Sequence, residues 1–372
     1  MKTVIDLTSL ADNFSGFERF ALNIALELLR QNPNQTFVLV FKGEVYPSFE
    51  MYRGKPEVSL VVLPRKDKLW SSQVTLLAAL KKIQADCYFF PAFPAPLFFR
   101  ARGIVNTIHD MGCWDCAKTM PLKMVVYFRM LYRNAARRSA YIVTVSKFSR
   151  TRIQKILKVD KKRIKVVYNG VSDDLYQQDE EKWNGIKKKY HMPDRYIMCL
   201  STLEPRKNLK LLLQAYKELL ESGEAMPPLV LAGRKGWKLD QVLGKLSCIE
   251  KGMVRLTGYV EEADLSLLYK HAEWFVFPSL YEGFGIPPLE AMAAGCKVIS
   301  SDAEAMKEVL GSHAVYFKNN NKEDLKKVLS ECVQGIVQVK SPDELKMYSR
   351  RFSYAEEVRH LCLEVKNEWR NS

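Results

Sequence analysis

The stretch Ser279-Leu-Tyr-Glu-Gly-Phe-Gly-Ile-Pro-Pro-Leu-Glu-Ala-Met-Ala-Ala-Gly295 follows a short apolar run, and together they predict a strand, a tight turn and a helix. The apolar run, residues 274–277, is typical of a buried strand. Gly283 and Gly285 let the backbone turn closely, because glycine adopts conformations that other residues disfavour. A strand, turn and helix in this order form the building block of parallel α/β folds, so this stretch decides the fold class.

Two carboxylates stand eight positions apart in this stretch, on the two sides of the turn. Pro287 and Pro288 suit a first helical turn, which places Glu290 early on a helix that we expect to reach about Ala294. Amides at a helix N-terminus attract anions, and carboxylates such as Glu282 and Glu290 accept hydrogen bonds from hydroxyl groups. The pattern predicts a site for a ligand with a diphosphate and hydroxyls, and a purely structural loop fits it poorly.

Short apolar runs alternate with segments of helical period along all 372 residues, and the composition of 47% apolar and 27% charged residues is that of a globular protein. The expected strands are residues 3–7, 36–41, 58–63, 87–90, 104–108, 141–145, 164–167, 196–200, 229–232, 254–256, 274–277, 297–300 and 314–317. This alternation favours parallel sheets. We predict an α/β protein with two Rossmann-like, doubly wound domains facing each other across a cleft, residues 1–171 and 192–351, joined by a polar linker at 172–191.

The N-terminus enters a short strand and meets Asp6 early, so we expect no signal peptide and a cytoplasmic protein. No uncharged apolar run approaches the ~20 residues of a membrane-spanning helix, so any membrane association is expected to be peripheral. Most of the eight cysteines lie in apolar runs and are expected to be reduced core thiols. Cys113 and Cys116 form a CxxC without a second pair at zinc-site spacing, so we expect free thiols and no metal.

The net charge of +15 comes from the first half of the chain. Residues 1–170 contain 28 Lys or Arg against 12 Asp or Glu, whereas residues 171–372 contain 29 against 30. Residues 118–170 hold 15 basic side chains, interleaved with aromatic and aliphatic ones, and a single acid, Asp160. This combination suits an anionic membrane surface, a lipid-linked pyrophosphate or a nucleic acid. A solvated basic face without a partner is the alternative.

Two loops after expected strands of the first half carry candidate ligand contacts, because ligands of open α/β sheets bind at the carboxyl ends of the strands. Gly16 precedes an amphipathic helix that reaches about Arg30, and its amides can approach a phosphate or an acceptor, although a plain turn fits as well. His109 and Asp110 follow the expected strand 104–108. A histidine there can donate a hydrogen bond to a sugar hydroxyl or a phosphate.

Two loops of the second half add positive charge and a glycine. Arg206 and Lys207 lie between the expected strand 196–200 and a helix that runs through Tyr216. Beside a helix N-terminus they form a cationic pocket suited to a diphosphate. Gly233 follows another expected strand, and we expect its loop to shape a nucleotide pocket.

Taken together, these loops resemble the retaining nucleotide-sugar glycosyltransferases of the GT-B architecture, group 1 or family 4, in the mannosyltransferase-like branch that builds bacterial surface polysaccharides. The element from Glu282 to Glu290 is specific when a Pro-Arg-Lys-Asn loop precedes it, as residues 205–208 do here. The resemblance runs through Ser15-Gly16, His109-Asp110, Val145-Ser-Lys-Phe-Ser149, Val166-Val-Tyr-Asn-Gly170, Leu203-Glu-Pro-Arg-Lys-Asn208, Leu256-Thr-Gly-Tyr259, residues 277–295 and Phe352-Ser-Tyr-Ala355.

The resemblance implies a donor site on the second domain. Glu290 would bind the ribose hydroxyls of the donor nucleotide. Glu282 and the amides around Phe284 and Gly285 would meet the transferred sugar. The donor-binding residues implied are Gly16, Arg206, Lys207, Gly233, Glu282, Gly283, Phe284, Gly285, Ile286 and Glu290.

The implied catalytic residues are His109, Glu282, Arg206 and Lys207. Arg206 and Lys207 would neutralise the leaving diphosphate, so the resemblance implies no metal and no other cofactor. His109 would contact the donor sugar near the reacting carbon, and Gly16 would line the acceptor side of the cleft. Departure and attack would occur on one sugar face through an oxocarbenium-like state. Glu282 is the obvious covalent nucleophile, but the family's usual reading gives it a donor-binding role.

The donor implied by the branch is GDP-mannose, with dTDP-rhamnose and UDP-sugars as alternatives. The acceptor would be a glycan, presented on a lipid pyrophosphate at the anionic inner face of the membrane, and not a nucleic acid. The loop 111–116 departs from the family and is expected to touch the acceptor. The last helix, in residues 352–372, would cross back onto the first domain. The residues assigned to acceptor or membrane are Asp110, Lys123, Arg129, Arg133, Arg137 and Arg138.

Two other functions remain open at this point. Sugar-nucleotide epimerases share the architecture, but they lack the Glu282 to Glu290 element in this form. A nucleic-acid-binding protein would use the basic half, but the chain has no recognisable nucleic-acid-binding signature, and the paired glutamates would be unexplained.

Overall fold

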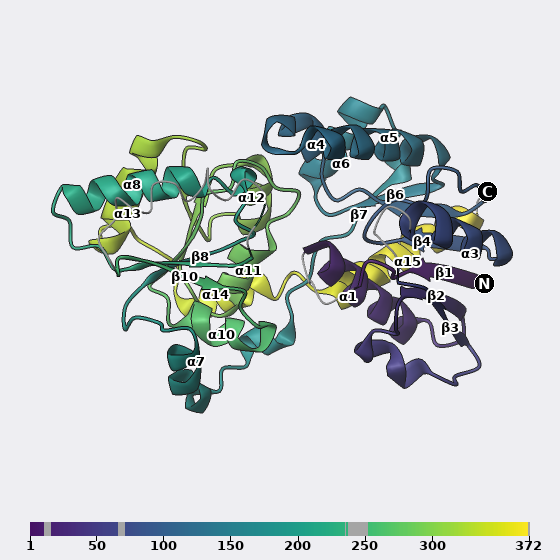
Figure 1. Ribbon diagram of the computed structural model, residues 1–372, viewed down its shortest axis with the longest axis horizontal. Coiled ribbons are helices and arrows are strands. Elements are labelled where there is room, and N and C mark those ends of the chain that lie inside the picture. The colour runs from purple at the N-terminus through teal and green to yellow at the C-terminus, as the bar shows by residue number, and fades with distance from the viewer. Residues whose placement is uncertain (11–15, 66–70, 235, 237–251, 371–372) are drawn as a thin grey trace. The chain divides into compact units, whose positions relative to one another are not determined.

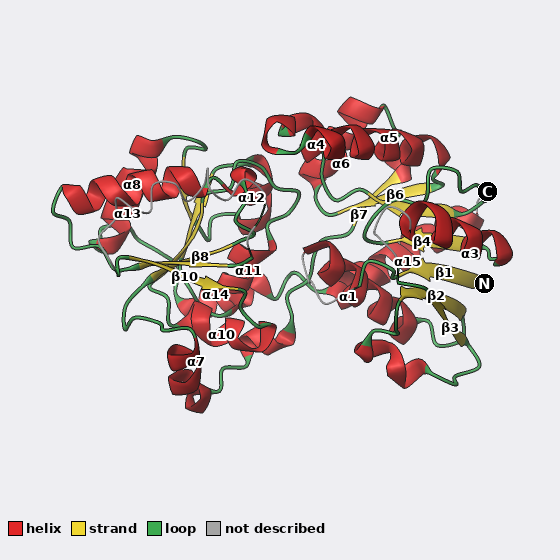
Figure 2. Ribbon diagram, in the orientation of Figure 1, coloured by secondary structure: helices red, strands yellow, loops and turns green. Residues whose placement is uncertain are grey.

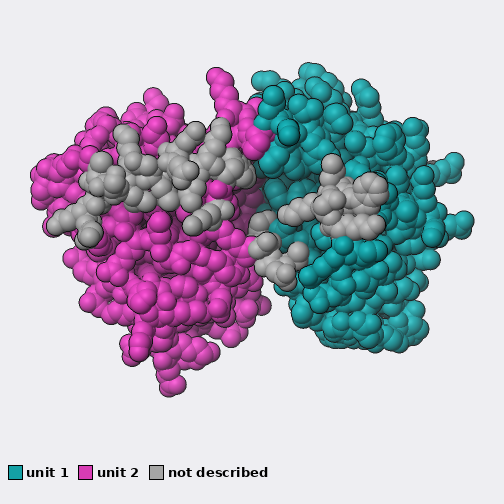
Figure 3. Space-filling model, viewed as in Figure 1, with its two compact units in different colours: residues 1–114, 122–169, 353–372 teal, residues 115–121, 170–352 magenta. Residues whose placement is uncertain are grey.

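The computed structural model describes residues 1–10, 16–65, 71–234, 236 and 252–370 (Figure 1). The chain divides into two compact units, which are coloured separately in Figure 3. Unit 1 comprises residues 1–114, 122–169 and 353–372, and unit 2 comprises residues 115–121 and 170–352.

Unit 1 is built on a seven-stranded parallel sheet of order β3-β2-β1-β4-β5-β6-β7. The strands are β1 (Lys2–Asp6), β2 (Thr36–Lys42), β3 (Val58–Leu63), β4 (Cys87–Phe90), β5 (Ile104–Thr107), β6 (Tyr141–Thr144) and β7 (Ile164–Val166). Most of these segments are continuous apolar runs, as expected for strands that helices cover on both faces. The strand order reverses between β1 and β4, which is the kind of switch point where open α/β sheets bind ligands.

The helices of unit 1 connect these strands, and the last of them comes from the end of the chain. They are α1 (Gly16–Gln31), α3 (Leu76–Lys82), α4 (Gly112–Asp115), α5 (Leu122–Arg138), α6 (Lys147–Leu157) and α15 (Tyr354–Arg370). Ser146 caps α6 by accepting a hydrogen bond from the amide of Ser149. Helix α15 packs on α1, where Gln31 donates to the carbonyl of Ala355 over 2.7 Å. The C-terminal segment therefore completes unit 1.

Unit 2 has a six-stranded parallel sheet of order β10-β9-β8-β11-β12-β13. Its strands are β8 (Ile197–Leu200), β9 (Leu229–Ala232), β10 (Val254–Gly258), β11 (Trp274–Phe277), β12 (Val298–Ser301) and β13 (Val315–Phe317). Its helices are α7 (Trp183–Lys189), α8 (Leu209–Glu221), α10 (Glu262–Lys270), α11 (Ile286–Ala293), α12 (Glu304–Leu310), α13 (Lys322–Val333) and α14 (Pro342–Ser349). Figure 2 shows α8 and α13 on one side of this sheet and α10, α11 and α14 on the other.

The predicted α/β class with two parallel, doubly wound sheets is confirmed. The stretch 172–191, which its polar composition suggested as a linker, instead belongs to unit 2. Its Ile186 is buried, Trp183 stacks on His271 with ring centroids 3.9 Å apart, and Glu180 accepts from His271 over 3.0 Å. Its polar side chains thus contact α10 rather than only solvent.

No helix within the described residues is long and apolar enough to cross a membrane. Cys113 and Cys116 form no disulfide, and Cys113 is buried. Among the described residues, His, Cys, Asp and Glu side chains form no group of three suited to a metal ion.

Candidate active site

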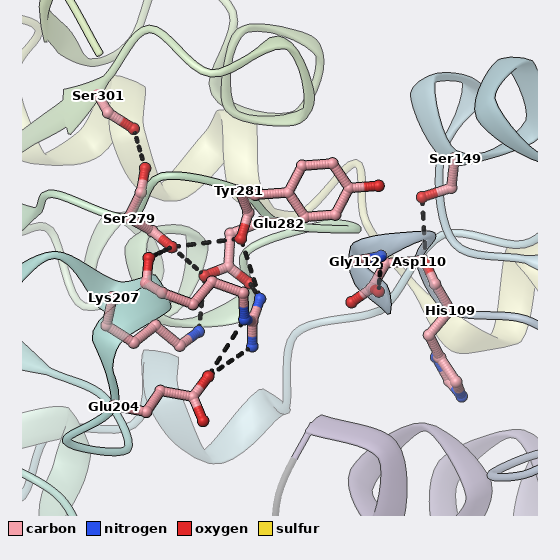
Figure 4. Close-up of polar contacts among 11 residues, drawn as sticks. His109, Asp110, Gly112, Ser149, Glu204, Lys207, Ser279, Tyr281, Glu282 and Ser301 are labelled. Atoms are coloured by element: carbon pink, nitrogen blue, oxygen red, sulfur yellow. Dashed lines mark hydrogen bonds and ion pairs between the residues drawn. The ribbon is translucent and has the colours of Figure 1, made fainter. Parts of the chain in front are cut away.

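The carboxylate of Glu282 lies at the centre of a polar cluster in unit 2, in the loop after β11 (Figure 4). Lys207 Nζ donates to its Oε1 over 2.6 Å, and Arg206 Nη1 donates to its Oε2 over 3.0 Å. Ser279 also donates to Oε1. Because the residue is only 7% exposed and its carboxylate has three donors around it, Glu282 is held in one orientation.

The surroundings of Glu282 keep it ionised. Burial by itself would raise its pKa, but the charges of Arg206 and Lys207 and the hydrogen bonds from Lys207 and Ser279 outweigh this and lower the pKa to about 2. The site therefore presents a buried negative charge at every pH at which the protein is expected to work.

Arg206 links the loop that follows β8 to the loop that follows β11 through hydrogen bonds and ion pairs. Its Nε and Nη2 lie 3.1 and 3.0 Å from Oε1 of Glu204, and its Nη1 donates to the carbonyl of Tyr281 over 2.9 Å as well as to Glu282. Its own carbonyl accepts from the amide of Leu280 over 2.9 Å. The guanidinium that we expected to face a diphosphate thus directs four contacts to the protein, and it positions Glu282.

Lys207 keeps capacity for a ligand. Its ammonium carries three N–H donors, and the contact to Glu282 uses one of them. Nζ also lies 5.4 Å from the centroid of the Phe277 ring, and the side chain is 13% exposed. Of the two cations, Lys207 is therefore the better placed to meet an anion.

Glu290 lies on α11, the helix predicted from the paired prolines. It is 3% exposed, and the hydroxyl of Tyr269 in α10 donates to its Oε2 over 3.0 Å. It is the fifth of the eight residues of α11, so it lies in the second turn of this short helix.

The turn between the two glutamates needs a glycine at position 285. Gly285 has φ of +87°, and a Cβ there would come within 2.2 Å of Cε of Met306. The ring of Phe284 is buried and faces Phe352 edge-on, with centroids 5.8 Å apart. Gly283 is buried in the same turn, and Ile286 is the first residue of α11. Since the Phe284 side chain belongs to the core, this turn can offer a ligand its backbone but not that ring.

Gly233 lets two backbone segments approach each other at the end of β9. Its φ is +127°, and a Cβ there would lie 2.0 Å from the carbonyl oxygen of Ser201. Its amide donates to the carbonyl of Gly258 over 2.8 Å. Gly233 thus shapes the edge of the sheet, and its amide already donates a hydrogen bond within the protein.

His109 is buried in unit 1, just after β5, and is 6% exposed. Its Nε2 lies 2.9 Å from the carbonyl oxygen of Pro91, and its ring packs against Phe17 and Phe20, with centroids 4.6 and 5.1 Å away. A carbonyl only accepts, so Nε2 carries the proton of the neutral ring and Nδ1 can accept. The proton that we expected His109 to donate to a ligand is therefore directed to Pro91.

Folding of the protein should depend on the protonation of His109. Burial lowers its pKa from 6.5 to about 4, partly opposed by hydrogen bonds to the backbone of Pro91 and Ala92. The unfolded chain therefore takes up the proton first, and we expect about 3 kcal/mol of stability to be lost as the pH falls from about 6.5 to 4. Urea unfolding at a series of pH values should show this slope reduced in His109→Gln but not in the exposed control His360→Gln. Equal slopes in both variants would contradict it.

Two further predicted residues of unit 1, Asp110 and Gly16, lie at or just before the start of a helix. Asp110 Oδ1 accepts from the amide of Gly112 over 2.7 Å and thereby starts the short helix α4. Gly16 is exposed and is the first residue of α1, while the preceding Ser15 lies outside the described residues.

The basic residues assigned to an acceptor or a membrane divide into two groups. Lys123, Arg133 and Arg137 are exposed. Arg138 instead donates to the carbonyl of Leu97 over 2.6 Å, and Arg129 donates to that of Cys113 over 2.9 Å. The two inward-pointing arginines secure loops of the protein, which the sequence alone did not indicate.

Three residues of this site were not predicted. Glu204 and Ser279 stand inside the motifs that were quoted, next to the cations and the carboxylate that they contact, so proximity in sequence is a signal that would have found them. Tyr269 is 21 positions before Glu290 and has no such signal. Only the packing of α10 on α11 brings the two together.

Comparison with known proteins extends over both units. The family described as Glycosyltransferase Family 4 matches residues 14–175, and that described as Glycosyl transferases group 1 matches residues 180–351. The O-antigen chain mannosyltransferase B of Escherichia coli is 32% identical over 259 residues, which are 69% of this chain and 67% of that protein. The serotype-specific mannosyltransferase WbdA of Escherichia coli is 29% identical over 249 residues, covering 64% of this chain but only 30% of that longer relative.

The fold also has a counterpart among solved structures. Alr3699/HepE of Anabaena, crystallised in complex with UDP-glucose, superposes with a TM-score of 0.74 at 16% sequence identity, over 99% of this chain and 100% of that one. At this identity the likeness concerns the fold. The chain therefore belongs to the group 1 glycosyltransferases of family 4, hexosyltransferases with the GT-B fold.

Proposed function

We propose that this glycosyltransferase moves a hexosyl unit from a nucleoside-diphosphate sugar to a glycan acceptor, with retention of configuration at the anomeric carbon. The observation that carries the proposal is the buried, ionised Glu282, held by Lys207, Arg206 and Ser279 ahead of a helix that carries Glu290. Membership in the family decides against the epimerase and nucleic-acid-binding alternatives.

In this proposal Glu282 binds the donor sugar and is not a nucleophile. Lys207 and Ser279 both donate to Oε1, and Arg206 donates to Oε2. These contacts occupy lone pairs and disperse the charge, which makes a carboxylate a poorer nucleophile. They leave its negative charge available to stabilise the positive charge that develops on the sugar ring.

The remaining residues take roles that follow from their contacts. The bond between the anomeric carbon and the diphosphate oxygen breaks, the acceptor oxygen forms the new bond, and its proton passes to the leaving diphosphate. Lys207 neutralises that diphosphate with its remaining donors, while Arg206 positions Glu282. Glu290 accepts from the ribose hydroxyls, and Nδ1 of His109 accepts from a hydroxyl of the donor sugar.

For the donor we propose GDP-mannose, because the relatives at 32% and 29% identity are mannosyltransferases. dTDP-rhamnose and UDP-sugars are the alternatives, and the HepE structure holds UDP-glucose. We further propose a lipid-linked glycan of a bacterial surface polysaccharide as acceptor, in keeping with the name O-antigen chain mannosyltransferase of a relative. The protein would then work at the cytoplasmic face of the membrane.

The proposal is tested by nucleoside-diphosphate release from a panel of GDP-, UDP- and dTDP-sugars, together with calorimetric binding of each donor. We expect binding and slow release with GDP-mannose, and at least about a tenfold weaker donor affinity in Glu290→Ala, because the ribose hydroxyls lose their acceptor. The exposed residue Glu323 provides the matched control Glu323→Ala. If the native chain bound none of these donors, the proposal would be wrong. Binding of another donor alone would correct the sugar but not the reaction.

A further inference from the structure

The outward side of α5 is made of apolar and basic side chains only. Six residues of this helix are exposed, and we call them the α5 face: Leu122, Lys123, Val126, Met130, Arg133 and Arg137. At about 100° per residue they all fall within an arc of about 100° around the helix. In Figure 1, α5 runs along the outside of unit 1, next to α6.

The apolar half of the α5 face is unusual for a solvent-facing helix. Leu122, Val126 and Met130 follow one another at intervals of four residues, and they are 77%, 51% and 48% exposed. The same helix already buries a separate apolar side, formed by Val125, Leu131, Tyr132, Ala135 and Ala136. An amphipathic helix needs one apolar side to join the core, so the second stripe is not required for folding.

The basic half has no acid to neutralise it nearby in sequence, since residues 116–159 contain no Asp or Glu. Lys123 stands beside the apolar stripe near the N-terminal end of α5. Arg133 and Arg137 extend the stripe toward the C-terminal end, and the guanidinium of Arg133 lies 5.6 Å from the Trp114 ring centroid. The α5 face therefore joins an apolar strip to a positive one.

We propose that the α5 face is the surface by which the protein binds an anionic lipid bilayer. Leu122, Val126 and Met130 enter the boundary between headgroups and acyl chains, while Lys123, Arg133 and Arg137 contact lipid phosphates. This inference rests on the proposed function, which needs an acceptor at the membrane, and it names the residues that hold the enzyme there.

Two other occupants fit the α5 face less well. A nucleic acid would match the positive charges but offers nothing to the apolar strip. A second copy of the chain would match the apolar strip, but it would bring two sets of like charges together without any acid on the helix to pair them. An anionic bilayer complements both halves.

The test is co-sedimentation of the full chain with vesicles of phosphatidylcholine alone or mixed with phosphatidylglycerol, at low and at high salt. The apolar variant carries Leu122→Ser, Val126→Ser and Met130→Ser, and the basic variant carries Lys123→Gln, Arg133→Gln and Arg137→Gln. A control variant carries Met51→Ser, Ile336→Ser and Met347→Ser, because these side chains are 68%, 64% and 69% exposed elsewhere. All of the changed side chains are exposed, so melting temperatures should match that of the native chain.

We expect the native chain and the control variant to bind only the mixed vesicles. The basic variant should bind about a hundredfold more weakly at low salt, at about fivefold per charge, and high salt should remove most of this difference. The apolar variant should bind at least about tenfold more weakly at either salt concentration.

The proposal is overturned if the native chain does not bind phosphatidylglycerol vesicles at low salt, or if the apolar variant binds as well as the control variant. A dimer that the apolar variant dissociates, or duplex DNA binding that only the basic variant loses, would assign the α5 face to those partners instead. Donor binding is measured on the same samples. Because the α5 face contributes nothing to the donor site, retained donor binding with lost vesicle binding would separate the failure of this inference from a failure of the proposed function.

Discussion

Replacing Glu282 by glutamine is expected to lower turnover by at least about a hundredfold, because the amide keeps the shape of the side chain but removes the charge that stabilises the positive transition state. The same change leaves Arg206 and Lys207 beside a neutral group in a site where their side chains are only 19% and 13% exposed. Breaking such a buried pair should also lower the free energy of unfolding by about 3 kcal/mol.

Turnover of Glu282→Gln is measured with the donor identified by the panel, and its stability by urea unfolding. Ser279→Ala is the comparison, since it removes one hydrogen bond to Glu282 but leaves both cations and the charge in place. It should lose far less activity. Because the pKa of Glu282 is lowered to about 2, the native rate should show no titration of this group above pH 4. A Glu282→Gln enzyme that kept near-native turnover would refute the electrostatic role.

Replacing Gly233 by alanine is expected to destabilise unit 2 by more than about 3 kcal/mol, the range of severe single substitutions. The new Cβ would lie 2.0 Å from the carbonyl oxygen of Ser201, where no side chain can move aside, and the residue would have to hold φ of +127°. Donor binding should be lost with the fold of this edge, because Ser201 directly follows β8, the strand that leads to Arg206 and Lys207.

The chain contains a matched control for this substitution. Gly223 also has a positive φ, +82°, but a Cβ there would meet no atom within 4 Å. Gly223→Ala should therefore cost only about 1 kcal/mol, from the backbone conformation alone. Thermal and urea unfolding of the two variants separate the clash from the strain. Equal destabilisation would mean that the backbone at Gly233 relaxes to accommodate the methyl group.

Several features of this protein followed from the sequence because they depend on local physics. A short apolar run such as Trp274–Phe277 is typical of a buried strand, and a proline pair after a glycine turn is typical of the start of a helix. Glu282, Arg206 and Lys207 were predicted for the same reason, since each follows a predicted strand, and Glu290 was predicted from the helix start that follows one of these turns. Parallel strands end at one edge of the sheet, so their loops converge.

Other features depend on contacts between residues that are far apart in the chain. For these features, predictions from composition and charge were incomplete or wrong. The polar composition of residues 172–191 suggested a linker, but Trp183 stacks on the ring of His271, and Glu180 accepts a hydrogen bond from Nε2 of that ring. Charge alone could not tell that Arg138 donates to backbone carbonyls while Arg137, next to it, faces solvent.

The sequence by itself determined the two parallel α/β sheets, and it predicted the loops of the candidate site with their pair of glutamates, because strand periodicity, glycine turns and helix starts act over a few residues. The tertiary structure alone decided how those residues are used. In the folded protein Arg206 contacts Glu204, Tyr281 and Glu282. His109 donates a hydrogen bond to the carbonyl of Pro91, and Tyr269 donates one to Glu290. The apolar stripe of α5 remains exposed to solvent. Hydrogen bonds and burial join groups far apart in the chain, and no local pattern encodes which partner each group will find.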